Sequence, residues 1–431
     1  MKLWQRSGTN TSEKIEAFTV GRDREFDLLL AKYDVIGSIA HIAMLQNVEL
    51  LSAVDHQILT AELNKILTEI NDGNFTIDSG CEDIHSQIEM MLTERLGEAG
   101  KKIHTGRSRN DQVAVDIKLY LRDEIRAIKD AVTQLFDLLL ELSNKHKEKL
   151  LPGYTHLQVA MPSSFGLWFA AYAESLTDDM QMLKTAYTIT NKNPLGSCAG
   201  YGSSFPLNRT MTTQLLGFGT LHYNSIYAQM SRGKTERFVA VALAAIAATL
   251  SRLSMDICLY MGQDFGFISF PDHLTTGSSV MPHKKNPDVF ELIRAKCNRI
   301  QSIPNELTLL CNNLPSGYHR DMQLTKEIVF PAIEEIKSCL EMACLMLAEI
   351  RVKENILDDE KYKYIFTVEK INELVNRGTP FREAYKQVAE EVQNNTFSYK
   401  PINIKHIHEG SIGNLSNDKI KEMFIAVSEK W

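Results

Sequence analysis

The sequence lacks the features that usually mark proteins of nucleic acids, membranes or the secretory pathway. Its 54 acidic residues outnumber its 47 lysines and arginines, so the formal net charge is -7. Proteins that bind nucleic acids usually carry a basic patch instead. It has no run of about 18 apolar residues, the length needed to cross a bilayer. The longest apolar stretch, residues 238–250, is bounded by Arg237 and Arg252 and is typical of a buried core helix. We therefore predict a protein with no nucleic-acid or membrane partner.

Cysteines are few, and their spacing does not suggest pairs. There are seven of them, an odd number, and no Cys-x-x-Cys motif occurs. This pattern favours reduced structural thiols, with a metal site or a disulfide framework as the alternative. The N-terminal residues Met1 to Arg6 lack the apolar stretch of a signal peptide. We predict a cytoplasmic protein.

The sequence does contain a sustained helical pattern. From Leu121 through Ile125 to Leu142, apolar residues recur in alternating steps of four and three, with polar residues on the opposite face. This heptad pattern predicts a long helix in a multi-helix core. At about 1.5 Å per residue, a helix over 113–150 would span roughly 55 Å. Similar patterns occupy residues 164–190, 234–262, 287–312 and 326–351, and strand-like alternation is scarce. The predicted fold class is mostly α.

Three turn-rich polar segments separate these helices, at residues 191–208, 262–286 and 312–325. Each is longer than a bundle connection needs, and such loops are often functional. We predict three domains: an N-terminal helical domain over 1–102, a central long-helix bundle domain over 103–351, and a small C-terminal domain over 352–431.

The first junction with functional character is His-Thr-Gly-Arg-Ser-Arg-Asn-Asp-Gln at residues 104–112. Asn110 or Asp111 is expected to cap the next helix and leave free N–H groups near Arg107 and Arg109. Backbone donors, helix dipole and guanidinium groups together suit a carboxylate. A capped helix with solvent-exposed arginines is the alternative.

The second junction is residues 152–158, where a Pro-Gly turn should deliver Thr155 and His156 into the next helix. A histidine there can exchange protons near neutral pH, although a structural histidine fits equally well.

The third junction, residues 276–288, contains Ser278 and Ser279 followed by two lysines. Asn286 is expected to cap a helix with Pro287 as its first residue. Lys284 and Lys285 beside that positive helix end would stabilise negative charge on a substrate, whereas a basic surface loop is the alternative. A fourth polar stretch, residues 315–326, has the composition of an ordinary solvated turn.

None of the common nucleotide-phosphate, dinucleotide or H-E-x-x-H zinc motifs is present. We therefore predict acid–base chemistry on a polycarboxylate, with no metal and no cofactor.

These segments resemble the fumarase/aspartase superfamily and, within it, the argininosuccinate lyase family. The superfamily loop Gly-Ser-Ser-x-Met-Pro-x-Lys-x-Asn is matched by residues 277–286. Residues 104–112 and 152–158 are similar to the argininosuccinate lyase forms of their regions, as are residues 82–85 and 380–384. The resemblance covers most of the chain.

The resemblance implies a homotetramer with a central core of about 20 helices, in which each active site gathers three segments from three subunits. It implies the reversible elimination of fumarate from argininosuccinate to give arginine, through a carbanion of aci-carboxylate form. Adenylosuccinate lyase of the same superfamily, and a non-catalytic scaffold that keeps the fold, are the alternatives.

The same resemblance assigns the catalytic roles. Ser278 would remove the proton beside a succinyl carboxylate, and Lys284 with Asn286 would hold the resulting charge. His156, oriented by Glu291, would manage the proton at the departing guanidinium. Base and acid can be exchanged between Ser278 and His156, and the neighbouring lysine and helix end favour Ser278 as the base. The implied substrate contacts are Ser108, Arg109, Asn110, Thr155, Tyr318, Gln323 and Lys326.

Several positions depart from the family pattern. His283 stands where glutamine is usual, Arg320 where lysine is usual, and Gly233 where an acidic residue is usual. Leu324 and Thr325 also replace acidic residues, and the usual Trp-Gly-Gly-Arg-Phe of the first segment is absent at residues 4–8. A substrate-binding serine expected near residues 18–27 has Asp23 or Thr19 as its candidate substitutes.

Overall fold

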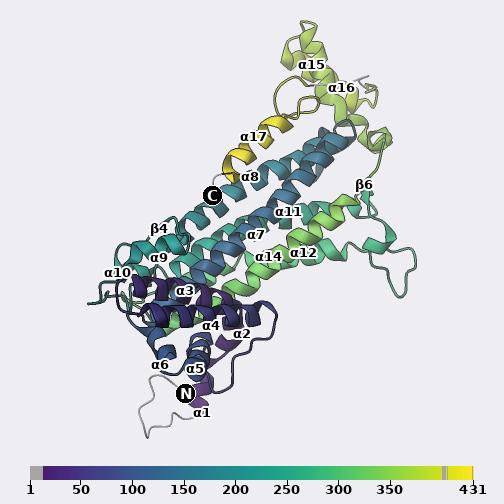
Figure 1. Ribbon diagram of the computed structural model, residues 1–431. Coiled ribbons are helices and arrows are strands. Elements are labelled where there is room, and N and C mark those ends of the chain that lie inside the picture. The colour runs from purple at the N-terminus through teal and green to yellow at the C-terminus, as the bar shows by residue number, and fades with distance from the viewer. Residues whose placement is uncertain (1–12, 400–403, 405, 430) are drawn as a thin grey trace.

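The computed structural model describes residues 13–399, 404, 406–429 and 431, and it confirms the mostly helical prediction. Long helices run side by side along one axis, with shorter helices gathered at both ends (Figure 1). The unusual segment at residues 4–8 and the N-terminal residues Met1 to Arg6 lie outside the described residues.

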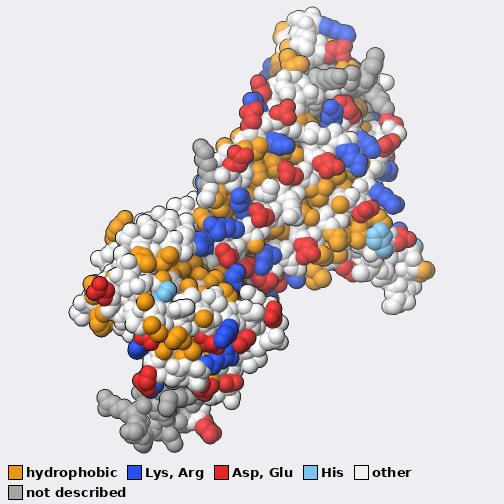
Figure 2. Space-filling view, in the orientation of Figure 1, with side chains coloured by type: hydrophobic (Ala, Val, Ile, Leu, Met, Phe, Trp, Pro, Cys, Tyr) orange, Lys and Arg blue, Asp and Glu red, His pale blue; other side chains and the backbone are white. Residues whose placement is uncertain are grey.

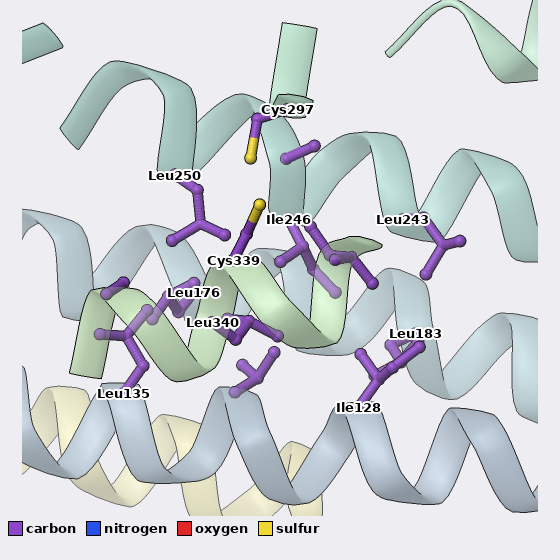
Figure 3. Packing of buried hydrophobic residues seen from close by; sticks show 14 of the residues in the cluster. Ile128, Leu135, Leu176, Leu183, Leu243, Ile246, Leu250, Cys297, Cys339 and Leu340 are labelled. Atoms are coloured by element: carbon purple, nitrogen blue, oxygen red, sulfur yellow. The ribbon is translucent and has the colours of Figure 1, made fainter. Parts of the chain in front are cut away.

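Four long helices form the bundle: α7 (Arg109–Lys145), α8 (Phe165–Thr190), α11 (Lys234–Met261) and α14 (Thr325–Ala348). The predicted heptad of α7 is buried, from Ile125 to Leu142. Figure 3 shows side chains from these helices facing one another: Ile128 and Leu135 of α7, Leu176 and Leu183 of α8, Leu243, Ile246 and Leu250 of α11, and Leu340 of α14. Because each apolar stripe faces the others, burial explains the packing of the bundle.

The helix predicted over 287–312 is in fact two helices, α12 (Asp288–Ile300) and α13 (Ile303–Leu310). Pro304 lies in the first turn of α13, where its missing N–H is harmless. A continuous helix would have needed that N–H, so the proline fixes the break.

The N-terminal end is built from α1 (Glu13–Val20), α2 (Asp23–Asp27), η1 (Leu28–Leu30), α3 (Ala31–Asn47), α4 (Ala53–Asn71), α5 (Ile84–Leu96), α6 (Glu98–Lys101) and η2 (Lys102–His104). These helices bury an apolar cluster of their own, which includes Leu45, Leu59 and Ile88. Beside them lie α9 (Arg209–Leu215) and α10 (Ser225–Met230), and the short parallel pair β3 (Lys192–Asn193) and β4 (Thr220–Leu221).

At the opposite end of the bundle, β1 (Leu150–Thr155) and β2 (Gln158–Ser164) form an antiparallel hairpin with Thr155 opposite Gln158. The prediction that residues 155–156 enter a helix is therefore wrong. Pro152 and Gly153 are poor helix formers, and Tyr154, Thr155 and Val159 favour strands. The helix begins later, at Phe165, where the Ser164 hydroxyl accepts the N–H of Leu167.

The rest of this end comprises β5 (Ile268–Ser269) paired with β6 (Arg351–Val352), the short helices η3 (Asp272–Leu274), η5 (Ile356–Asp358) and η6 (Glu360–Phe366), and α15 (Thr367–Asn376) and α16 (Phe381–Gln393). A small apolar cluster joins α15 to α16 through Ile371, Ala384 and Val388. The last helix, α17 (Asn417–Ser428), returns along α8, and Phe424 stacks on Phe136.

Two helical stretches, Asp23–Asn47 and Lys234–Met261, are long and apolar enough to cross a membrane by length and composition alone. Packing accounts for their apolar character, since 67% and 50% of the most apolar windows are buried. Figure 2 shows further hydrophobic side chains on the surface, over the long helices and the N-terminal helices.

The seven cysteines all lie within the described residues and are free thiols, as predicted. Cys297 of α12 and Cys339 of α14 point toward each other in the core (Figure 3).

Candidate active site

The start of α7 is fixed by a capping box. The Ser108 hydroxyl accepts the N–H of Asn110 at 3.3 Å, and the N–H of Ser108 donates to Asp111 Oδ1 at 2.9 Å. The predicted cap at Asn110 or Asp111 is therefore wrong by two or three residues, because Ser108 takes that role. The other Asp111 oxygen accepts the N–H groups of Gly196 and Cys198, both at 2.9 Å. Asp111 thus ties the 196–198 loop to the helix start.

Five of the predicted substrate-binding residues line one cavity of about 400 Å³, here called the α7 pocket. They are Arg109, Asn110, Tyr318, Gln323 and Lys326. Motifs more than 200 residues apart in the sequence therefore meet beside the first turn of α7. Ser108 does not line the pocket, because its hydroxyl caps the helix.

The α7 pocket carries charges of both signs. Arg109 lies 3.5 Å from Asp83 and donates to the Ser86 hydroxyl at 3.3 Å. Lys326, which is only 3% exposed, pairs with both Asp23 and Asp27. Burial opposes the charge on Lys326, yet the two carboxylates raise its pKa. Burial and then the charge of Asp27 raise the pKa of Asp23 to about 6. Paired charges of this kind suit a zwitterionic amino acid.

Segment 19–27 forms one side of this pocket. Asp23, the first candidate for the missing serine, lines the cavity. The hydroxyl of Thr19, the second candidate, donates to Ile15 O at 2.9 Å, and the Thr19 carbonyl accepts the Gln323 amide at 3.0 Å. The position therefore favours Asp23 over Thr19.

Three of the predicted catalytic residues, Lys284, Asn286 and Glu291, line a second cavity of about 520 Å³, here called the α12 pocket. The loop above it is closed at its base, where the N–H of Asn286 donates to Thr276 O at 2.9 Å. The Asn286 amide donates to Gly277 O at 3.2 Å. Asn286 is therefore not the helix cap that we predicted: its polar groups hold the loop, and α12 begins at Asp288.

Ser278 sits inside this loop with its oxygen already accepting hydrogen bonds. The N–H groups of Val280 and Met281 donate to Ser278 Oγ at 3.3 and 3.1 Å. Two backbone donors stabilise an alkoxide more than a hydroxyl, and so favour ionisation of the serine. Of the two loop lysines, Lys285 pairs with Asp272.

His156 occupies the turn of the β1–β2 hairpin, and both it and Thr155 are exposed. His156 and the following Leu157 have positive φ values of 54° and 59°. Two such residues in succession match the twist of a two-residue hairpin turn, although the conformation is strained for a branched residue such as leucine.

A single chain does not bring all of these residues together. Arg109 begins α7, and the hairpin that carries His156 follows its other end, 37 residues or about 55 Å away along the helix. Arg232 of the α7 pocket and Gly262 of the α12 pocket flank the two ends of α11, which is 28 residues or about 42 Å long. The α7 pocket thus lies at one end of the bundle, whereas the α12 pocket with its loop and the hairpin turn follow the far ends of α11 and α7, and His156 lines neither cavity.

One group among the described residues has the spacing of metal ligands: Asp34, His85 and Asp116, whose ligand atoms lie within 4.8 Å of one another. His85 Nδ1 lies 2.8 Å from Asp34 Oδ1, which also accepts the Gln112 amide. Burial raises the pKa of both the Asp34 and the Asp116 carboxyl groups, and the positive charge of Arg107 opposes this rise in both. A nearby guanidinium opposes a cation, and Asp34, His85 and Gln112 form a hydrogen-bonded network that joins α3, α5 and α7.

Sequence patterns gave no site role to Asp27, Glu82 or Asp83, which form the acidic wall of the α7 pocket together with the candidate Asp23. Glu82 and Asp83 belong to a segment that carried the family resemblance, which was the available signal. Asp27 had none, because its partner Lys326 is 299 residues away.

Two departures from the family pattern have a local explanation. Gly233 has φ +72°, and a Cβ there would lie 2.5 Å from Cys311 Sγ, so a larger residue does not fit. Thr325 is buried, and its hydroxyl lies 3.5 Å from Glu236 Oε1, where an acidic residue would meet a like charge. Nothing in the structure explains His283, and Leu324 is exposed.

Comparison with known proteins gives consistent results. The profile of a family described as Lyase matches residues 5–302. An argininosuccinate lyase of Bacteroides thetaiotaomicron is 58% identical over 422 residues, which is 98% of this chain and 94% of that protein. An argininosuccinate lyase of Parabacteroides distasonis is 57% identical over 426 residues, which is 99% of this chain and 95% of that protein.

Among solved structures, an EDDS lyase in complex with formate superposes with a TM-score of 0.82. The match covers 98% of this chain and 91% of that chain at 21% identity, so it shows the fold alone.

Proposed function

Because the chain belongs to the argininosuccinate lyase family, we propose that it eliminates fumarate from argininosuccinate and leaves arginine by acid–base catalysis. Argininosuccinate carries three carboxylates, an ammonium and a guanidinium, so its site must hold both signs of charge. The α7 pocket does so, because Arg109 and Lys326 line it together with Asp23 and Asp83.

We assign the amino-acid end of the substrate to the α7 pocket. Its carboxylate would pair with Arg109 beside the N-terminus of α7, where backbone N–H groups and the dipole favour an anion. Its ammonium would face Asp23 and Asp83. Asn110 and Tyr318 supply neutral hydrogen-bonding groups around it, and Gln323 lines the same pocket.

The succinyl end is assigned to the loop that carries Ser278. Ser278 removes a proton from the carbon beside a carboxylate, and the charge passes into that carboxylate as an aci-carboxylate. Lys284 and Asn286 hold this charge. The observation that supports Ser278 as the base is the pair of backbone N–H groups that already donate to its oxygen.

The carbon–nitrogen bond then breaks, and its electron pair leaves with the guanidine nitrogen. His156, with Glu291 as its orienting partner and Thr155 beside the substrate, returns a proton to that nitrogen. Arginine and fumarate are the products, and the balance of protons and electrons requires no cofactor.

We propose further that the chain acts as a homotetramer in which three subunits build each site. The support is the separation of the α7 pocket from the hairpin turn along the whole length of α7. Exposed apolar side chains on the long helices offer contact surface, among them Met182 of α8, Met255 of α11 and Leu345 of α14. Such helices would pair into a core of about 20 helices. The free thiols suit the reducing cytoplasm.

The experiment follows fumarate by its ultraviolet absorbance after addition of argininosuccinate, with adenylosuccinate as the control substrate. The wild-type protein should release fumarate from the first and not from the second. Ser278→Ala should keep its fold and assembly, yet lose about three or more orders of magnitude in turnover. Ser279→Ala, at the neighbouring exposed serine, is the matched control and should stay within about threefold of wild type. Undiminished turnover in Ser278→Ala would remove the proposed base.

A further inference from the structure

The C-terminal end of α1 is held by side chains from a segment 300 residues later. The last carbonyls of a helix have no partner within it and are satisfied from outside. In η4 (Arg320–Leu324), Gln323 Nε2 donates to Thr19 O at 3.0 Å and to Val20 O at 3.2 Å. Arg320 Nη2 donates to Thr19 O at 3.0 Å. Together these two side chains cap α1.

Arg320 also fixes the orientation of Gln323. Its Nε donates to Gln323 Oε1 at 3.2 Å, so the amide oxygen is occupied and the NH₂ group faces the α1 carbonyls. The same guanidinium donates to Glu82 Oε1 at 2.7 Å. One side chain therefore joins three segments of the chain, at residues 19, 82 and 323.

These three segments form the acidic side of the α7 pocket. After Gly21, which has φ +52°, the chain turns into α2 and presents Asp23 and Asp27 to Lys326. Glu82 is followed by Asp83, the partner of Arg109. Arg320 thus adds a third link between the two acidic segments, beside the hydrogen bonds from Arg24 to the carbonyls of Ser79 and Cys81 and from the N–H of Ile84 to Asp27.

We propose that Arg320 is a positioning residue that sets the affinity of the α7 pocket for the amino-acid end of the substrate, by orienting Gln323 and holding the Thr19–Asp23 segment against the Glu82–Asp83 segment. The role rests on the proposed function. It also accounts for arginine at a position where lysine is usual. Three acceptors on three segments suit a planar fork with five donors, whereas a lysine must reach all of them from a single nitrogen.

The test compares Arg320→Met, Arg320→Lys and Glu82→Gln in steady-state assays with argininosuccinate, with arginine and fumarate as product inhibitors. In Arg320→Met, KM and the arginine inhibition constant should each rise about tenfold. The turnover number and the fumarate inhibition constant should stay within about twofold of wild type. Arg320→Lys and Glu82→Gln should lie between these values. Arg377→Met, at an exposed arginine that pairs with Glu373 on α15, is the matched control and should change none of them.

A double mutant separates positioning from direct contact. If Arg320 acts through Gln323, adding Gln323→Met to Arg320→Met should weaken arginine binding by less than about twofold more. An independent further loss overturns the inference, as does a fall in turnover with unchanged arginine affinity. The milder lysine and glutamine variants keep the test valid if Arg320→Met does not fold. Failure of the proposed function is distinct, because the wild-type protein would then release no fumarate at all.

Discussion

Replacing Lys326 by methionine tests whether the stability of the fold around the α7 pocket depends on a buried ion pair. The Lys326 side chain is 3% exposed, and Asp27, one of its two carboxylate partners, is 1% exposed. Methionine keeps most of the aliphatic volume, so the change removes the charge and little packing. The buried Asp27 and the partly buried Asp23 are then left without their cation.

Removing one partner of a buried pair lowers the free energy of unfolding by about 3–5 kcal/mol, because the other charge stays buried and uncompensated. Proton uptake reduces this loss at low pH. Burial and its neighbour already raise the pKa of Asp23 to about 6, and loss of the Lys326 charge raises it further. A carboxyl group whose pKa is higher in the folded than in the unfolded protein stabilises the fold at low pH, where it is protonated. This contribution is lost as the pH rises through the pKa of the folded protein. The destabilisation should therefore be smaller near about pH 5 than near about pH 8.

Denaturant midpoints measured by circular dichroism provide the assay, at one protein concentration because the stability of an oligomer depends on it. Asp27→Asn combined with Lys326→Met removes charges of both signs, and should recover at least about half of the loss. A single variant within about 0.5 kcal/mol of wild type would refute the reasoning. Equal losses at both pH values would refute it as well.

Two further predictions concern Asp23 and Gly233. Asp23 has a pKa raised to about 6, so protonation below that pH should remove a negative charge and weaken arginine binding. Asp23→Asn should weaken arginine binding at neutral pH and should remove the further weakening of binding at low pH. If the arginine inhibition constant of this variant depends on pH as in the wild type, the assignment of Asp23 is contradicted. Gly233→Ala should lower the free energy of unfolding by about 2–4 kcal/mol, because the positive φ and the contact with Cys311 both oppose a Cβ. Gly202→Ala, with φ +80° and no atom within 4 Å of its Cβ, should lose only the conformational part, about 1–2 kcal/mol. Equal losses in thermal or chemical unfolding would show that the contact with Cys311 is unimportant.

Periodicity predicted the long helices well, because each buries a continuous apolar stripe that can be recognised within its own sequence. Residues 164–190, 234–262 and 326–351 became α8, α11 and α14 with ends shifted by at most three residues. The β1–β2 hairpin was not recognised, because pairing between Thr155 and Gln158 depends on a turn of two positive-φ residues that are not glycine. No local pattern indicates that turn.

The site residues also divide into those recognisable from local motifs and those that depend on long-range contacts. Arg109, Gln323 and Lys326 were found from motifs, and they line one cavity. Their partners were missed where the contact spans the whole chain, as for Asp27 with Lys326. Gly233 shows a further limit, since its positive φ and the proximity of Cys311 are properties of the folded backbone rather than of neighbouring residues.

The proposed contribution of different subunits to one site can be tested by mixing two inactive variants. Arg109→Gln alters the α7 pocket and Ser278→Ala alters the loop. The two subunits would be coexpressed with different tags so that oligomers containing both can be isolated. If each site takes residue 109 and residue 278 from different subunits, random hybrids should regain about one quarter of wild-type activity. Hybrids of wild-type subunits with the Arg109→Gln/Ser278→Ala double variant should also show about one quarter. The shared site would be contradicted if hybrids of the two single variants were no more active than their parents and if hybrids of wild type with the double variant kept about one half of wild-type activity.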